Sequence, residues 1–308
     1  MTRSGREGSG RRLSAELYTG PFHVVLRAAI RQRGLTLERL RVHLARRGIT
    51  VGLSSLSNWQ TGHTRPDTPG SLRAIRALEE ILGLPPGSLV RLLPDADPGT
   101  RPGQERRGGV ADIAPVAELL DAVPGAQDRD VELVSVQHKI AVDAQRRTTS
   151  MWSRTVVRAL RDGVDRYLVR YYGNPGCVPS LVRPRPLGNC SLARFVPHPS
   201  APALVYELAF GHELRAGETW VFECELVDPT AGVSREFAYG FRYPAEQYVL
   251  EVAFDPHARP SACYSFAQRD LSDERHPTGT LTLSTHNTVH LIASVVSSGV
   301  LGIRWEWP

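Results

Sequence analysis

The spacing of apolar residues changes near residue 130 of this 308-residue chain, and no other sequence feature constrains the fold as strongly. Before that point, apolar residues recur three and four positions apart, which is the spacing of one face of an α-helix. From about Val131 onward, apolar and polar residues alternate in short runs, which is the pattern of half-buried β-strands. The sequence therefore predicts an α+β multidomain fold, with an all-α N-terminal part and an all-β C-terminal part.

Five short helices are expected within residues 18–93, which we predict to form one compact domain. Gly34 would end the first helix, whose buried face carries Phe22, Val25, Leu26, Ala29 and Ile30. Thr36 would cap the second helix, a third would run from about Leu53 to Gln60, and Ser71 would cap the fourth. The run "SLVRLL" predicts a fifth short turn.

The remaining boundaries follow from composition. Residues 1–17 read as a disordered basic tail, and residues 94–130 as a linker that is rich in Pro, Gly and charge. A weak helical stripe within this linker predicts a short helix, with apolar residues at Ile113, Val116, Leu119 and Leu120. Residues 131–308 are expected to form a domain for sensing or dimerisation.

Short strands at regular spacing, separated by turn residues, favour an antiparallel β-sandwich for residues 131–308. The clearest hairpin signal is Asp162-Gly163, which lies between two β-rich runs and is typical of a type I′ turn. No alternation of strands and helices occurs, so a doubly wound parallel sheet is not expected.

Positive charge is concentrated in the first part of the chain. Residues 1–108 contain 18 Arg, no Lys and 9 Asp or Glu, which gives them a net charge of +9. The rest of the chain has a net charge of −4, and the whole chain therefore has a net charge of +5. A basic segment attached to a mildly acidic one indicates a module that binds a polyanion. The planar guanidinium of arginine suits contacts with phosphate or guanine.

The helix pair from Thr36 to Gln60 has the pattern of a helix-turn-helix, whose second helix enters the major groove of DNA. Four apolar residues would hold the two helices at a fixed angle: Leu40, Leu44, Leu56 and Trp59. Small polar residues would remain on the outer face of the second helix, at Ser54, Ser57 and Asn58, where they suit close approach to base edges.

The stretch from Ser55 to Pro66, "SLSNWQTGHTRP", together with "SLRAIRALEEILGLPPG" after it, resembles the Xre/Cro-type helix-turn-helix regulators in their actinobacterial form. The resemblance covers about residues 21–93. The link "ARRGITVG", residues 45–52, is longer than the corresponding link in phage repressors. The C-terminal part resembles an uncharacterised β-rich region found on such regulators, from which no chemistry carries over.

This resemblance and the helix pattern together imply a set of DNA contacts. Base contacts are expected from Leu53, Ser54, Ser57 and Asn58. Contacts with the DNA backbone are expected from Thr61, His63, Thr64, Arg65, Arg31 and Arg33.

Candidate catalytic and metal-binding residues in the C-terminal part have simpler interpretations. His286 and His290 would lie roughly 13 Å apart along a strand, too far to chelate a metal by themselves. His212, Glu213 and Glu218 fall in a turn, where an acid–base pair has no further support. The four cysteines are expected to be free and mostly buried, and Trp220, Trp305 and Trp307 to be core residues or, less favoured, the walls of a ligand pocket.

The sequence thus predicts a cytoplasmic, nucleoid-associated regulator of transcription that binds specific double-stranded DNA as a homodimer. We expect no catalytic residues, no metal, no cofactor and no enzymatic activity. One alternative stays open in which the β domain binds a small molecule or protein effector and thereby regulates DNA affinity. A less favoured alternative is an enzyme with a DNA-targeting module.

Overall fold

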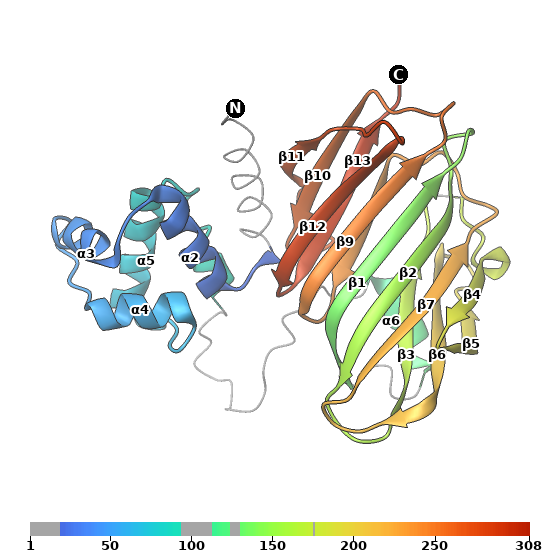
Figure 1. The fold of residues 1–308 in the computed structure, drawn as a ribbon, viewed down its shortest axis with the longest axis horizontal. Coiled ribbons are helices and arrows are strands. Elements are labelled where there is room, and N and C mark those ends of the chain that lie inside the picture. Colours follow the sequence, from blue (N-terminus) through green and yellow to red (C-terminus); the bar gives the residue numbers. More distant parts are fainter. Residues whose placement is uncertain (1–18, 94–112, 124–129, 175) are drawn as a thin grey trace.

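The computed structural model describes residues 19–93, 113–123, 130–174 and 176–308 (Figure 1). The predicted basic tail, residues 1–17, and most of the predicted linker lie outside these residues. The described chain is helical in its N-terminal part and β-rich in its C-terminal part, with three sheets. The division into separate domains stays a prediction.

The N-terminal part contains four α-helices and one 3₁₀ turn among its described residues. They are α2 (Phe22–Arg33), α3 (Leu37–Ala45), α4 (Leu53–Thr61), α5 (Pro69–Leu82) and η1 (Val90–Leu92). The side chain of Thr36 caps α3 by accepting a hydrogen bond from the backbone N–H of Arg39. The predicted cap of the fourth helix was wrong: Thr68 caps α5, Pro69 begins the helix, and Ser71 completes a reciprocal capping box at its third position.

The helices of the N-terminal part enclose one apolar core. Leu40, Leu44, Leu56 and Trp59, which the sequence placed at the centre of the helix pair, are all buried. A buried carboxylate holds the end of this part in place. Glu79 on α5 accepts hydrogen bonds from the backbone N–H groups of Gly87, Leu89 and Val90 at 2.7, 2.7 and 3.1 Å.

A further helix, α6 (Ala114–Asp121), precedes the β-rich part. Its buried side chains pack against strand β6 (Ala203–Leu214), beside Ala203 and Val205. The Nε2 atom of His198 lies 3.1 Å from the carboxylate of Glu118, which ties the exposed side of α6 to the same region.

The β-rich part contains thirteen described strands. These are β1 (Val131–Val142), β2 (Thr148–Ala159), β3 (Val164–Tyr172), β4 (Arg183–Gly188), β5 (Ser191–Pro197), β6, β7 (Thr219–Val227), β8 (Glu236–Phe241), β9 (Ala245–Phe254), β10 (Ala262–Gln268), β11 (His276–Leu281), β12 (Thr288–Val296) and β13 (Gly299–Glu306). One sheet has the order β12-β9-β1-β2-β7-β4, a second β11-β10-β13-β8, and a third β3-β6-β5. Figure 1 shows the six-stranded sheet in front of the two smaller ones.

The expectation of a purely antiparallel region was wrong at one position. β1 and β9 pair in parallel, with Leu133 opposite Ala245 and Val142 opposite Phe254. β9 follows β8, which belongs to another sheet, so the chain returns to β1 by a crossover rather than by a hairpin.

The predicted hairpin at Asp162-Gly163 was also wrong. β2 pairs with β1 and β7, whereas β3 pairs with β6 in a different sheet. The turn does have the backbone conformation that its glycine permits, with φ of 78° at Gly163. Its Asp162 carboxylate, however, accepts a hydrogen bond from the backbone N–H of Ala216, so the turn connects two sheets.

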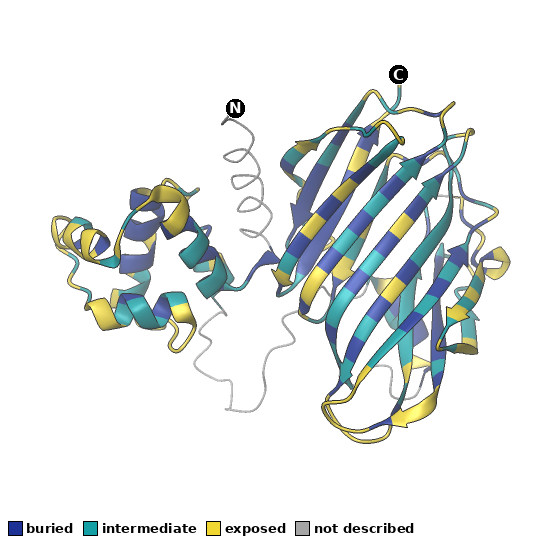
Figure 2. Ribbon diagram, in the orientation of Figure 1, coloured by how far each residue is buried: buried dark blue, intermediate teal, exposed yellow. Residues whose placement is uncertain are grey.

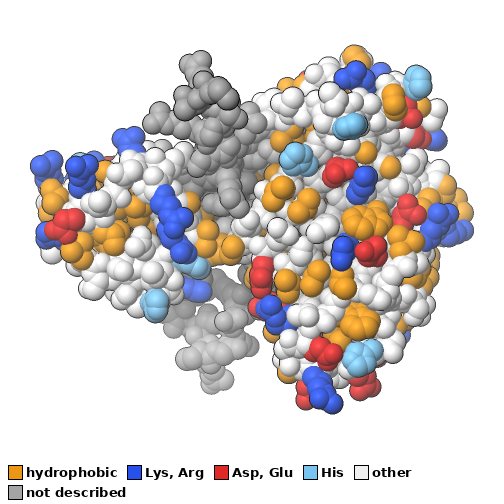
Figure 3. Space-filling model, in the orientation of Figure 1, with side chains coloured by type: hydrophobic (Ala, Val, Ile, Leu, Met, Phe, Trp, Pro, Cys, Tyr) orange, Lys and Arg blue, Asp and Glu red, His pale blue; other side chains and the backbone are white. Residues whose placement is uncertain are grey.

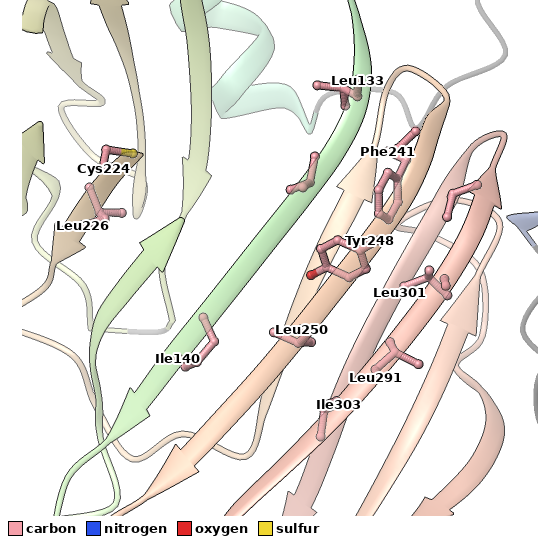
Figure 4. Packing of buried hydrophobic residues seen from close by; sticks show 14 of the residues in the cluster. Leu133, Ile140, Cys224, Leu226, Phe241, Tyr248, Leu250, Leu291, Leu301 and Ile303 are labelled. Atoms are coloured by element: carbon pink, nitrogen blue, oxygen red, sulfur yellow. The ribbon is translucent and has the colours of Figure 1, made fainter. Parts of the chain in front are cut away.

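One buried cluster draws apolar side chains from all three sheets. Figure 2 shows the resulting alternation of buried and less buried residues along the strands of the six-stranded sheet. In Figure 4, Leu291 of that sheet lies near Leu301 and Ile303 of β13, and Leu250 lies near Ile303.

The opposite face of the six-stranded sheet carries interspersed acidic and basic side chains (Figure 3). Lys139 and Glu251, on neighbouring strands, form an ion pair of 3.0 Å, and Arg158 lies within 3.1 Å of Glu132. The two faces of this sheet therefore differ in polarity, and the apolar one faces the interior.

Candidate ligand-binding site

A cavity of about 740 Å³ lies inside the β-rich part. β1, β2 and β7 of the six-stranded sheet line one side of it, and β3 and β8 line the other. Ile113, Pro115 and Val116, at the start of α6, also line it. Tyr172 and Leu271, which are 54% and 48% exposed, lie where the cavity meets solvent.

β7 and the central part of β2 contribute side chains at alternate positions, whereas residues 148–151 at the start of β2 all line the cavity. On β7 these are Phe222, Cys224 and Leu226, and on β2 they include Ser153 and Thr155. Such alternation is expected from strands whose side chains point to opposite faces. This floor is mostly apolar, with a few small polar groups. The Ser153 hydroxyl lies 3.0 Å from the Cys224 sulfur, and the Thr155 side chain makes no hydrogen bond within the described chain.

β3 and β8 contribute the longest consecutive runs: 167–174 from β3 and the segment after it, and 236–240 from β8. Both are the last strands of their sheets. The cavity therefore lies between two sheet edges that do not pair with each other.

Aromatic rings gather in one part of the cavity lining. The His138 ring lies 4.8 Å from that of Tyr239 and 5.7 Å from that of Phe237, measured between centroids. Its Nδ1 atom lies 3.3 Å from the hydroxyl of Tyr248, which stacks on Tyr239. On the β3 side, Tyr167 packs against Phe222 at 5.3 Å.

Burial keeps these ionisable side chains neutral. It lowers the pKa of His138 to about 3, so the imidazole carries no charge at neutral pH. Burial is also the largest cause of the raised pKa values of Tyr167 and Tyr239 and of the Cys224 thiol. This aromatic part of the cavity thus offers neutral donors and acceptors.

Five charged side chains also line the cavity, and three of them are arginines. Arg170, Arg242 and Arg275 line it together with two carboxylates, Asp228 and Glu236. Arg275 and Glu236 form an ion pair of 2.6 Å. The lining therefore carries a net positive charge, which favours a ligand with an anionic group.

Asp228 also fixes the segment beside the cavity. Its carboxylate accepts hydrogen bonds from the backbone N–H and the hydroxyl of Thr230, and the Tyr171 hydroxyl lies 3.5 Å away. Burial, followed by the contact with Asp228, raises the pKa of the nearby Cys177 thiol to about 12. All four cysteines are free and three are buried, as expected.

The predicted DNA-contact residues lie elsewhere, on α4, at the C-terminal end of α2 and in the segment after α4. Most are exposed, whereas Ser57 and Asn58 are only partly so. Their predicted roles stay untested, and none of them lines the cavity.

The other sequence candidates are not brought together either. His286 lies in the turn before β12 and His290 lies on that strand. His212 and Glu218 approach to 3.6 Å on the surface. Trp220, Trp305 and Trp307 do not line the cavity; the indole N–H groups of the last two donate to the backbone oxygen of Ser234. Within the described ranges, no three His, Cys, Asp or Glu side chains are placed to hold a metal ion.

The cavity residues could be suspected from the sequence only at His138. It shares the period-two spacing of Val136 and Ile140 and therefore falls on the buried face of its strand. A titratable residue on an otherwise apolar strand face is the one sequence signal for this cavity. Tyr167 and Tyr239 resemble ordinary core tyrosines, and nothing in the sequence distinguishes them.

No family model matches the chain, and no curated protein matches it. Solved structures match 57% of its length. One is a "putative protease" from Parabacteroides distasonis, with a TM-score of 0.38 and 8% identity over 40% of that chain. Another is an M1 zinc metallopeptidase from Deinococcus radiodurans, with a TM-score of 0.34 and 13% identity over 42% of that chain. A mutant of this metallopeptidase bound to a Tyr-Ser-Ala substrate matches with a TM-score of 0.32 and 14% identity over 43%. The match spans less than half of each of these proteins.

These matches contradict the prediction of a DNA-binding transcriptional regulator, because they are peptidases or protease-like proteins. They also contradict the prediction that the chain is not an enzyme. TM-scores below 0.4 transfer no activity to this chain. In the described part of the chain, no helix is both long and apolar enough to cross a membrane.

Proposed function

We propose that this protein binds a largely apolar organic ligand that carries an anionic group, in the cavity of its β-rich part. The observation that carries the proposal is the cavity of about 740 Å³, which is lined by several aromatic rings and by three arginines against two carboxylates. Pockets for organic ligands typically enclose about 300–1,000 Å³ and combine apolar walls with a few polar groups.

The chemistry of the walls supports this choice of ligand. Tyr239 and Phe222 offer ring surfaces to an apolar body, and Thr155 and His138 offer hydrogen bonds without a charge. A largely apolar molecule would gain about 25 cal/mol for each Å² of apolar surface that it buries. Its anionic group would lie toward the arginines.

The proposal includes an architecture. We propose that the three sheets form a two-layer β-sandwich, in which β8 and β3 are neighbouring but unpaired edges of the second layer. The buried cluster with members from all three sheets supports this arrangement. For the N-terminal part, we propose only that α3 and α4 pack as a helix-turn-helix, and the likeness to Xre/Cro-type proteins stays a prediction.

The test is a fluorescence titration with 1-anilinonaphthalene-8-sulfonate, which joins an aromatic body to a sulfonate. Thr155→Phe adds a ring to the cavity floor, whereas Val156→Phe adds the same ring at the next position of β2, on the opposite face. We expect the dye to bind the wild-type chain and Val156→Phe alike, and Thr155→Phe at least about tenfold more weakly, a loss of about 1.4 kcal/mol.

Thermal unfolding of both variants serves as the control for folding. Equal dye affinity for Thr155→Phe and the wild-type chain, with both folded, would show that the dye binds outside the cavity and would refute the proposal.

A further inference from the structure

The free edge of β8 exposes backbone groups to the cavity. The backbone oxygen of Arg235 accepts a hydrogen bond from the N–H of Trp305 at 2.8 Å, so Arg235 faces β13. In an antiparallel pair the direction of backbone groups alternates, so Phe237 and Tyr239 also face β13. The N–H and C=O groups of Ala238 and Gly240 consequently point away from β13, toward the cavity.

These groups have no partner in the described part of the chain. β8 is the last strand of its sheet, and neither Ala238 nor Gly240 makes a hydrogen bond on its outer side. Gly240 has no side chain and still lines the cavity, which places its backbone at the cavity wall. Both residues are exposed to solvent.

β8 also lacks the usual protection of a sheet edge. Exposed edges commonly carry lysine, proline or a bulge, which prevent another strand from pairing. The outward positions Ala238 and Gly240 are small, and β8 pairs with β13 without a register shift. The edge instead lines the cavity, where Ala238 and Gly240 remain open to solvent.

We propose that the ligand is an extended peptide segment of another protein, which adds to the edge of β8 as a new strand. Its backbone would pair with Ala238 and Gly240, as in other cases of recognition by strand addition. This inference rests on the proposed function and names the class of ligand.

The cavity also sets the side-chain preference of such a peptide. Alternate side chains of an added strand would point toward the aromatic interior around Tyr239 and should be apolar. The net positive lining, with Arg242 and Arg275 near β8, favours acidic residues at the intervening positions. The expected peptide therefore alternates apolar and acidic residues.

The test begins with selection of octapeptides from a random display library against the full chain. Selected peptides are then synthesised with a fluorescent label, both unmodified and with N-methyl groups on alternate amides. Binding is measured by fluorescence anisotropy, and the exchange of the Ala238 and Gly240 amides is followed by NMR.

We expect selected peptides to be rich in acidic residues and to slow the exchange of these two amides. The two N-methylated series carry their methyl groups on alternate sets of amides. The series that methylates the amides facing β8 should bind at least about tenfold more weakly, because it lacks the N–H groups that donate to the edge of β8. Ala238→Pro removes one edge N–H without touching the bonds to β13, and should weaken binding by a similar factor. Ala238→Val keeps the N–H and should bind within about twofold of the wild-type chain.

The contrary outcomes are distinct. Failure to select any peptide, or equal binding of both N-methylated series, overturns the inference. If the dye of the previous section still binds in the cavity, the proposed function survives with a non-peptide ligand; if it does not, both proposals fail. Slow exchange at Ala238 and Gly240 without peptide would mean that the chain itself, or a second copy, already covers the edge, and would also overturn the inference.

Discussion

At the scale of single residues, Glu79 shows how one buried carboxylate can organise a chain end. It is 2% exposed and accepts three backbone hydrogen bonds from the segment after α5. The apolar spacing of α5 predicted its buried face through Leu78 and Leu82 but gave no role to a glutamate between them. Its partners lie eight to eleven residues later in the chain, a separation that helical periodicity does not address.

We predict that Glu79→Ala destabilises the helical N-terminal part by about 3 kcal/mol, because three backbone donors lose a charged acceptor. Glu80→Ala is the matched control, since Glu80 is adjacent but exposed and pairs only loosely with Arg47, at 3.8 Å. Urea denaturation of the two variants, monitored by the helical signal in far-ultraviolet circular dichroism, provides the comparison. Equal losses of stability would exclude the anchoring role.

His138 makes the stability of the β-rich part depend on pH. Its folded pKa is about 3, whereas an unfolded histidine has a pKa near 6.5, so below pH 6.5 the unfolded state binds a proton that the native state does not. The free energy of unfolding is therefore not reduced by His138 above pH 6.5, and it decreases as the pH falls from 6.5 toward 3.

Between pH 7 and pH 5, we expect His138 to account for a loss of about 2 kcal/mol, at about 1.4 kcal/mol per pH unit below 6.5. The free energy of unfolding of His138→Gln, whose side chain does not titrate, should fall by about 2 kcal/mol less over the same interval. Denaturant unfolding of both chains at pH 7 and at pH 5 measures this difference. A variant with an unchanged pH slope would contradict the assignment.

At the scale of elements, the turns show where local sequence signals stop being informative. Asp162-Gly163 has the residues and the glycine conformation expected of a hairpin turn, yet its flanking strands belong to different sheets. The hairpin that does form, between β1 and β2, turns at residues 143–147 without glycine. There Arg146 adopts a φ of 66°, and the Asp143 carboxylate binds Arg147 through its backbone N–H and guanidinium. Which of these turns joins two paired strands depends on pairing between distant strands, and a local sequence pattern does not encode that pairing.

The segment around Cys177 supplies a test at this scale. Asp228 and Thr230 hold it against the sheet, and burial raises the pKa of the Cys177 thiol to about 12. We predict that Cys177 resists alkylation by iodoacetamide at pH 8 in the folded chain, because the thiolate is the reactive form. Asp228→Ala should increase its alkylation rate at least about tenfold by releasing this segment.

Asp270→Ala is the control, since Asp270 holds a similar turn through Ser272 but lies far from Cys177 in sequence. Alkylation is quantified at each cysteine by mass spectrometry. An unchanged rate at Cys177 in the folded Asp228→Ala chain would contradict the anchoring role of Asp228.

At the scale of the whole molecule, the change of hydrophobic period near residue 130 correctly predicted a helical part followed by a β-rich part. The burial of Leu56 and Trp59 also followed from spacing alone. The cavity did not, because it depends on how two sheet edges, β8 and β3, lie against a third sheet. The resemblance of residues 21–93 to regulators directed attention to Asn58 and Arg65, whereas the cavity lies in the β-rich part.

The location of a bound ligand tests the central proposal most directly. The chain has two methionines, and one of them, Met151, lines the cavity. With methyl-labelled methionine, nuclear Overhauser effects from bound 1-anilinonaphthalene-8-sulfonate report whether the dye lies beside Met151. We predict such effects for the wild-type chain and for Val156→Phe, and their loss in Thr155→Phe. Saturable dye binding without any effect at the Met151 methyl would contradict the proposal that this cavity is the ligand-binding site.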